Sequence, residues 1–235
     1  MTQHVVIAGG TGEVGRQLLL LLAQRPDLYV RALVRKPGSL PAAANLEELP
    51  FIFEDPGAYG PLFGPPCDLL LIALGTTRAR AGSAEAFLHV DRDYPMRLIS
   101  ALATTHPGAK VGLVSSVGAD QGKGLYLGAK ATVEAELEAS GLAHAIARPS
   151  FLRSDRREFR LLEVIVNRLI APPWLALGRL AFAGSPGWWR WAPVHVREVA
   201  TALLKATLSL QPGQRQILEG LDLHPGPMTR MAFDR

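Results

Sequence analysis

A tyrosine and a lysine stand four positions apart in residues 125–130, where Tyr126 and Lys130 form the pattern Tyr-x-x-x-Lys. In a helix, residues four apart lie on the same face, so a phenol and an ammonium group become neighbours. A nearby positive charge favours the ionised form of a phenol. Such a phenol can give a proton to a carbonyl oxygen, or take one from an alcohol, near neutral pH. The pattern predicts acid–base chemistry at Tyr126 assisted by Lys130, and the alternative is an ordinary helix surface.

Two serines precede this pair. Ser115 is the last residue of a short apolar run at residues 111–115, and Ser116 follows it. The run has the character of a buried strand. A hydroxyl at the end of a strand can orient the oxygen of a substrate. The pattern Tyr-x-x-x-Lys alone often occurs by chance. Serines upstream of it make the pattern a more specific sign of a catalytic site. Either Ser115 or Ser116 could be the serine that contacts the substrate.

A glycine-rich turn joins the first strand-like run to the first helical segment. Its glycines have the spacing G-x-x-G-x-x-G, which suits a tight turn, a close approach of backbone to a pyrophosphate, and close packing of helix on strand. The start of the helix would then direct N–H groups at the phosphates. The alternative is a purely structural turn. The residues expected around a bound dinucleotide are Gly9, Thr11, Gly12, Glu13, Val14 and Gly15.

The end of the second strand distinguishes the two nicotinamide dinucleotides. Sites for NAD place an acidic residue there to bind the ribose 2′-hydroxyl. This chain has Arg35 and Lys36 instead, and Arg16 stands just after the glycine run. Arginine can bind a 2′-phosphate with two parallel hydrogen bonds. The pattern favours NADP(H) over NAD(H), and the alternative is that Arg35 and Lys36 belong to a solvated loop.

Short apolar runs alternate with helical periodicity along the chain, which predicts an α/β fold with a doubly wound, Rossmann-like parallel sheet. We expect one domain over residues 1–235, with residues 151–195 and 210–235 forming a small substrate-facing lobe. The pattern predicts strands at residues 4–8, 29–34, 51–53, 69–74, 111–115, 143–147 and 215–218. It predicts helices at residues 12–24, at 84–104 with a kink at Pro95, and at 125–139, 156–170 and about 196–208.

The composition narrows the class of protein. The chain is 48% hydrophobic and 20% charged, which is typical of a globular protein with a sizeable core. Its 25 basic and 21 acidic residues leave a small excess with no tight basic stripe, so we expect no nucleic-acid partner. The single cysteine, Cys67, has no metal-ligand spacing around it, so we expect a buried thiol and no metal site. We also expect no membrane span and a cytoplasmic location.

The glycine run, Ser115-Ser116, Tyr126 and Lys130, in this order, resemble the short-chain dehydrogenase/reductase superfamily. Further segments are similar to its atypical, Tat-interacting-protein-like branch, which also resembles NmrA-like proteins. These segments are residues 74–78, 90–94, 115–120 and 148–156.

The resemblance implies roles for several further residues. Leu74 and Gly75 should line the inner ribose and the nicotinamide, and Asp55 should lie near the adenine. Arg148 should end a strand on the nicotinamide side, and Arg156 should face cofactor or substrate. His195 should start a packing helix, or else contact the substrate.

Two questions stay open from the sequence. All four tryptophans fall between Trp174 and Trp191, where they either bury area in the lobe or form an apolar substrate mouth or a partner surface. The whole chain is either an NADP(H)-dependent oxidoreductase acting on a small carbonyl or alcohol, or an NADP(H)-binding regulatory protein. A homodimer or a protein partner fits both alternatives.

Overall fold

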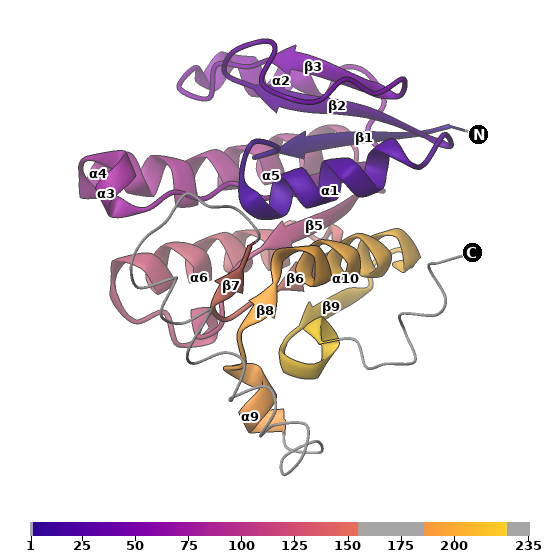
Figure 1. Cartoon of the computed structure of the whole chain (residues 1–235). Helices are drawn as coiled ribbons and strands as arrows, with labels where there is room; N and C mark the ends of the chain where they lie inside the picture. Colours follow the sequence, from indigo (N-terminus) through magenta and orange to yellow (C-terminus); the bar gives the residue numbers. More distant parts are fainter. Residues whose placement is uncertain (1, 155–185, 225–235) are drawn as a thin grey trace.

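A parallel sheet forms the centre of the computed structural model, which describes residues 2–154 and 186–224. Within these residues seven strands lie in the order β3-β2-β1-β4-β5-β6-β9, and all neighbouring pairs are parallel (Figure 1). The order reverses between β1 and β4, as in doubly wound sheets. The strands are β1 (Gln3–Ala8), β2 (Leu28–Val34), β3 (Leu46–Pro50), β4 (Leu69–Ile72), β5 (Lys110–Val114), β6 (Ala143–Ala147) and β9 (Arg215–Leu218).

Helices cover both faces of this sheet. On one face, α1 (Glu13–Ala23) packs beside α10 (Val196–Ser209) (Figure 1). On the other face lie α2 (Tyr59–Leu62), α5 (Tyr94–Thr105) and α6 (Gly124–Ala139). Each face has its own apolar core, so β4, with all four residues buried, is apolar throughout. The predicted α/β class and its parallel sheet are confirmed.

The predicted helix over residues 84–104 is present, but its irregularity differs from the expected kink at Pro95. Between α4 (Ala84–Leu88) and α5 the chain makes a π-helical turn, η2 (His89–Asp93). Pro95 is accommodated in the first turn of α5, where a proline needs no hydrogen-bond partner for its nitrogen. A π-helical turn changes the direction in which side chains point, and such turns are frequent at functional sites. Here it accompanies the burial of Asp91, which is 1% exposed.

The third strand was predicted wrongly. The structure places β3 at Leu46–Pro50, whereas residues 51–53 have no strand conformation. β3 is an edge strand with an exposed or half-buried pattern, and it contains Glu47 and Glu48. An edge strand that carries charged residues lacks the apolar pattern from which strands are predicted. Phe51 and Phe53 are apolar because their rings pack in the core under the sheet, not because they belong to a strand.

Smaller elements surround the end of β6. A short parallel pair joins β7 (Leu152–Arg153) to β8 (Val194–His195), and α9 (Pro186–Arg190) packs on η5 (Gly220–Leu223). His195 caps α10 by accepting a hydrogen bond from the Arg197 N–H at 3.2 Å, which confirms that it starts a packing helix. The predicted helix at residues 156–170 lies outside the described residues.

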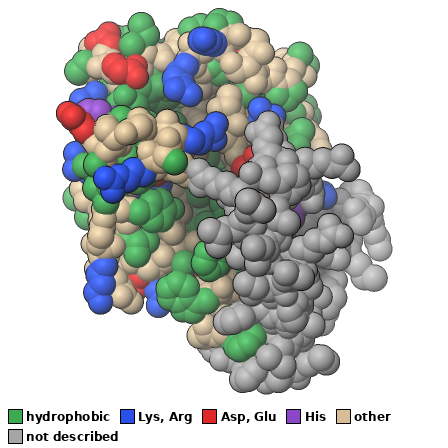
Figure 2. Space-filling model, turned by 60° about the vertical axis from the view of Figure 1, so that its left-hand side comes forward, with side chains coloured by type: hydrophobic (Ala, Val, Ile, Leu, Met, Phe, Trp, Pro, Cys, Tyr) green, Lys and Arg blue, Asp and Glu red, His purple; other side chains and the backbone are tan. Residues whose placement is uncertain are grey.

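Cys67 is a buried thiol, as expected. Its side chain is 3% exposed, and burial raises the pKa of the thiol to about 12. The thiolate, which is the reactive form, is therefore scarce at neutral pH. Across residues 2–154 and 186–224, no helix has the length and apolar character needed to cross a membrane. Figure 2 shows lysine and arginine side chains spread over the described part of one face.

The glycine-rich turn packs backbone against backbone. Gly9 has φ +93°, and a Cβ there would lie 2.7 Å from the Leu74 nitrogen. A Cβ on Gly15 would lie 2.8 Å from the Gly9 carbonyl carbon. Gly12 differs, because a Cβ there would first meet the Gly9 oxygen at 3.3 Å. Close packing against backbone thus requires glycine at Gly9 and Gly15. Gly12 is less crowded than either.

We expect Gly15→Ala to lower the free energy of unfolding by about 2 kcal/mol or more, because the new methyl group collides with rigid backbone. Gly12→Ala should cost less than about 1 kcal/mol, since its new methyl group would come no closer than 3.3 Å to the Gly9 oxygen. Urea unfolding of the two variants without added nucleotide measures the difference. Equal destabilisation by both would show that the turn does not depend on this close packing.

Candidate functional site

The start of α1 is open toward solvent. Gly12 is the N-cap residue, and it forms no side-chain capping hydrogen bond, so the first N–H groups of α1 can serve an anion. Thr11 is exposed beside it. Val14 packs its side chain in the core, so only its backbone can contribute to a binding site. The Glu13 carboxylate accepts a hydrogen bond from the Ser154 hydroxyl.

The basic residues predicted to select the dinucleotide lie at the end of β2. Arg35 and Lys36 are exposed, and within the described residues neither has a carboxylate partner within 4.0 Å. Arg16 lies in the first turn of α1 and donates from Nε to the Thr11 carbonyl at 3.1 Å. Basic groups therefore stand on two sides of the glycine-rich turn.

A buried ion pair lies at the end of β4. Lys130 Nζ is 3.1 Å from Asp91 Oδ1, and the two side chains are 7% and 1% exposed. Asp91 Oδ2 accepts from the Thr76 N–H at 2.7 Å, and Lys130 Nζ donates to the Leu74 carbonyl at 3.4 Å. A Cβ on Gly75 would lie 3.6 Å from Asp91 Oδ1 and 4.0 Å from Lys130 Nζ. Leu74, Gly75 and Lys130, each predicted from the sequence, thus meet at one point.

Asp91 is a site residue that sequence reasoning missed, although residues 90–94 contribute to the resemblance. An acidic residue in an otherwise helical, partly apolar segment was the available signal. Its Oδ1 receives no well-aligned hydrogen bond from the described residues, so its contact with Lys130 is mainly electrostatic. A buried carboxylate oxygen of this kind retains capacity to accept a further hydrogen bond.

Tyr126 lies one helical turn before Lys130 in α6, on the same side of the helix. Its side chain is 45% exposed, while Lys130 below it is buried. The ring packs at 6.2 Å, centroid to centroid, on the ring of Phe87 in α4. The phenol therefore reaches the surface while its neighbour stays inside, which suits a group that meets an incoming molecule.

The two serines differ in their surroundings. Ser115 is 4% exposed and donates its hydroxyl hydrogen to the Glu134 carboxylate. Ser116 is half-buried, and its hydroxyl has only a long contact, 3.4 Å, with the Val117 carbonyl. Ser115 is engaged in the protein interior, so Ser116 is the serine that retains a hydroxyl for another molecule.

Glu134 is a second residue that sequence reasoning missed. It stands four positions after Lys130 in α6 and is 7% exposed. Arg148 binds both of its oxygens, with Nη2 2.5 Å from Oε2 and Nε 3.1 Å from each oxygen. Hydrogen bonding to Glu134 raises the pKa of Arg148 further above its ordinary value. The i, i+4, i+8 spacing of Tyr126, Lys130 and Glu134 was the signal in the sequence.

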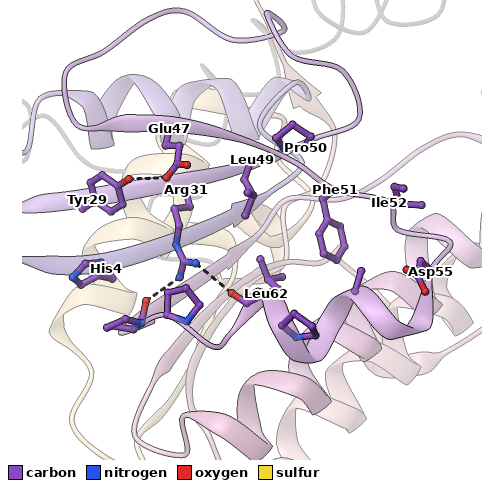
Figure 3. A pocket seen from close by; sticks show the side chains of 14 residues that line it. His4, Tyr29, Arg31, Glu47, Leu49, Pro50, Phe51, Ile52, Asp55 and Leu62 are labelled. Carbon is purple, nitrogen blue, oxygen red and sulfur yellow. Dashed lines mark hydrogen bonds between the residues drawn. The ribbon is translucent and has the colours of Figure 1, made fainter.

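Two predicted residues are not brought into this group. Asp55 caps the short helix η1 (Pro56–Ala58), accepting from the Gly57 N–H at 2.8 Å. It lines a groove of about 660 Å³ beside β2 and β3, which Figure 3 shows. Its expected place near the adenine remains a prediction. Arg156 lies outside the described residues.

The groove itself offers few binding groups. Arg31 spans it and donates to the carbonyls of Leu62 at 3.2 Å and Pro66 at 2.9 Å (Figure 3). Glu47 accepts from the Tyr29 hydroxyl at 2.6 Å. These polar groups satisfy one another, and neither Tyr126 nor Lys130 lines the groove. The groove is therefore separate from the residues predicted to be catalytic.

The residues present fit a dinucleotide. An open helix start follows a glycine turn at the point where the strand order reverses, which is where doubly wound sheets bind nucleotides. Lys130 of α6 and Asp91 of η2 lie against the turn that follows β4, the strand next to β1. The described residues contain no group of three or more His, Cys, Asp or Glu side chains that could hold a metal ion.

We expect Asp91→Ala to lower the free energy of unfolding by about 3–5 kcal/mol, because it leaves the buried Lys130 ammonium unpaired. Asp91→Asn should cost less, since its amide oxygen still accepts from Thr76. Asp27→Ala, which breaks an exposed pair with Arg25, is the control and should leave the free energy of unfolding nearly unchanged. Urea unfolding measures all three, and a loss in Asp91→Ala as small as in the control would contradict the buried pair.

Comparisons with known proteins agree with this geometry. A family model described as NAD(P)H-binding matches residues 9–165. The chain is 35% identical over 224 residues to protein HTATIP2 of Rattus norvegicus, covering 92% of this chain and 86% of the relative. It is 34% identical over 160 residues to protein FMP52, mitochondrial, of Candida albicans, covering 65% of this chain and 68% of the relative.

A solved structure shares the fold. The Bordetella bronchiseptica enzyme WbmH in complex with NAD+ matches with a TM-score of 0.68 at 15% identity, covering 93% of this chain and 75% of that one. At this identity the likeness concerns the fold alone. Family model, relatives and fold agree, and the chain belongs to the NAD(P)H-binding family of atypical short-chain dehydrogenases/reductases, in the branch that contains HTATIP2 and FMP52.

Proposed function

We propose that this protein is an NADP(H)-dependent oxidoreductase that interconverts a small carbonyl compound and the corresponding alcohol. One observation supports this most strongly: the Lys130 ammonium lies where the Gly75 turn, the Asp91 carboxylate and the Tyr126 helix meet. An enzyme that reduces a carbonyl by hydride transfer needs a proton donor close to the bound cofactor. Here one turn of α6 carries both Tyr126 and Lys130.

The preference for NADP(H) rests on charge. Arg35 and Lys36 stand exposed at the end of β2 with no carboxylate within 4.0 Å in the described part of the chain, so their charges are available to a 2′-phosphate. An acidic residue, which would favour the 2′-hydroxyl of NAD, does not occupy this position. Arginine can form two parallel hydrogen bonds with a phosphate. The 2′-phosphate would bind across this strand end.

Lys130 and Asp91 would hold the ribose next to the nicotinamide. An ammonium has three hydrogens; Lys130 donates one to the Leu74 carbonyl, and its charge lies 3.1 Å from Asp91 Oδ1. A remaining hydrogen can bond a ribose hydroxyl. Asp91 Oδ1 has capacity to accept from the same hydroxyl or its neighbour. The missing Cβ of Gly75 leaves space for this contact.

Tyr126 would transfer the proton. The nicotinamide, when bound, supplies or accepts the hydride. The Tyr126 hydroxyl gives its hydrogen to the substrate oxygen during reduction and takes it back during oxidation. Lys130 lies one turn away in the same helix. Ser116 would donate a hydrogen bond to the same substrate oxygen, because Ser115 is committed to Glu134.

The proposal also includes a substrate-facing lobe and a cytoplasmic location. Residues 151–195 and 210–235 would form the substrate-facing lobe, of which the structure describes 151–154, 186–195 and 210–224. The fungal FMP52 relatives bear the word mitochondrial in their names, so a cytoplasmic location stays a prediction for this chain. A regulatory NADP(H)-binding protein is the second candidate, and the measurement below separates the two.

We expect Tyr126→Phe to lower kcat/KM by about 10²–10⁴-fold, because the proton donor is removed. The dissociation constant for NADPH should change by less than about twofold, since Lys130 remains. NADPH oxidation with a panel of aldehydes and ketones measures the rate, and nicotinamide fluorescence measures binding. Tyr29→Phe, at a distant exposed tyrosine, is the control and should keep the wild-type rate.

Two results would contradict the enzyme. If Tyr126→Phe keeps the wild-type rate, Tyr126 is not the proton donor. If wild-type protein binds NADPH but turns over no member of the panel, the regulatory function is favoured.

A further inference from the structure

Five charged side chains form a continuous chain around the loop that carries Ser116. Their charges alternate in the order Glu134, Arg148, Glu219, Arg190 and Asp120. Arg148 Nη1 donates to Glu219 Oε1 at 2.9 Å, Arg190 Nε lies 3.1 Å from Glu219 Oε2, and Arg190 Nη2 donates to Asp120 Oδ1 at 2.8 Å. We call these five residues the charge chain.

The charge chain begins and ends on the same loop. At one end Glu134 accepts from Ser115, directly before Ser116. At the other end Asp120 stands in η3 (Ala119–Gln121), directly after the left-handed Gly118. The segment between these anchors contains Ser116. Backbone hydrogen bonds from Ser115 and Val117 to the Ala147 and Pro149 carbonyls also hold this segment, at 2.8 and 2.9 Å. The charge chain adds side-chain contacts to α6 at one end and to α9 at the other.

The charge chain also joins elements that are distant in sequence. Glu134 belongs to α6, Arg148 follows β6, Glu219 follows β9, and Arg190 ends α9. A Cβ on Gly220 would lie 3.1 Å from the Arg190 nitrogen, so α9 is seated directly on the backbone after β9. Trp189 is buried there, at 6% exposed, and its ring centroid lies 5.1 Å from that of His224.

Exposure rises along the charge chain. The side chains of Glu134 and Arg148 are 9% and 13% exposed, whereas those of Arg190 and Asp120 are 31% and 37% exposed. Hydrogen bonding to Arg190 lowers the pKa of Asp120 below its usual value, so this carboxylate stays charged at neutral pH. A partner in the outer half can therefore be removed without leaving a deeply buried charge unpaired, which is not so in the inner half.

We propose that Arg190 is a positioning residue, which holds the Ser116 loop in place by joining Asp120 to Glu219. The kinetic part of this inference rests on the proposed function, and the structural part does not. Seating of α9 on the end of β9 would then order the loop that contacts the substrate oxygen. The phosphate-binding turn at Gly9–Gly15 lies outside the charge chain, so cofactor binding should not depend on it.

Hydrogen exchange followed by mass spectrometry tests the structural part without a substrate. In Arg190→Gln, peptides covering residues 115–124 should exchange about two- to fivefold faster than in wild type, while peptides from β1 and α1 are unchanged. Asp120→Asn should give the same local effect, and the double variant should add little to either single variant. Arg190→Lys should recover part of the protection. Arg25→Gln, which breaks the exposed pair with Asp27, is the control and should leave residues 115–124 unchanged.

Kinetics test the second part. With the best carbonyl compound of the panel, Arg190→Gln should lower kcat several-fold and leave the dissociation constant for NADPH unchanged. Unchanged exchange at residues 115–124, or equal acceleration throughout the protein, would overturn the proposal. Faster local exchange with an unchanged kcat would overturn its catalytic part. If wild-type protein turns over no compound, the proposed function fails, and the exchange result still decides the role of Arg190.

Discussion

The carboxyl ends of the parallel strands meet at one edge of the sheet, and the candidate site depends on this constraint. The strand order reverses between β1 and β4, so the connections after these strands leave toward opposite faces. The glycine turn follows β1, Gly75 follows β4 and Ser116 follows β5. Residues far apart in the sequence therefore converge without any long-range motif. A parallel sheet buried on both faces holds these strand ends rigidly.

Buried charge is concentrated at this edge. Lys130 and Asp91 form one pair beneath the surface, and Glu134 and Arg148 form another one turn further along α6. Taking such groups out of water costs free energy unless each is paired and hydrogen-bonded. Each pair joins α6 to a different part of the fold, namely the end of β4 and the end of β6. The two pairs therefore fix α6, the helix that carries Tyr126, at two successive turns.

The sequence predicted the repeating features of the fold better than its local irregularities. The strands flanking the core were predictable because their apolar runs are continuous, whereas β3 was missed because an edge strand can carry Glu47 and Glu48. Lys130 was predictable from its spacing to Tyr126. Its partner Asp91 was not, because the pairing depends on a π-helical turn that side-chain periodicity does not encode. The link from Arg190 to Asp120 spans 70 positions, and only the fold brings them together.

Titration of the protein with NADPH and with NADH, followed by nicotinamide fluorescence, tests the central claim most directly. NADPH should bind more tightly than NADH. Arg35→Ala should weaken NADPH binding by about 10- to 100-fold and leave NADH binding nearly unchanged, because only NADPH carries the 2′-phosphate. Arg25→Ala, at a distant surface arginine, should leave both affinities unchanged. Failure of wild-type protein to bind either dinucleotide would contradict the claim that this edge of the sheet is a nucleotide site.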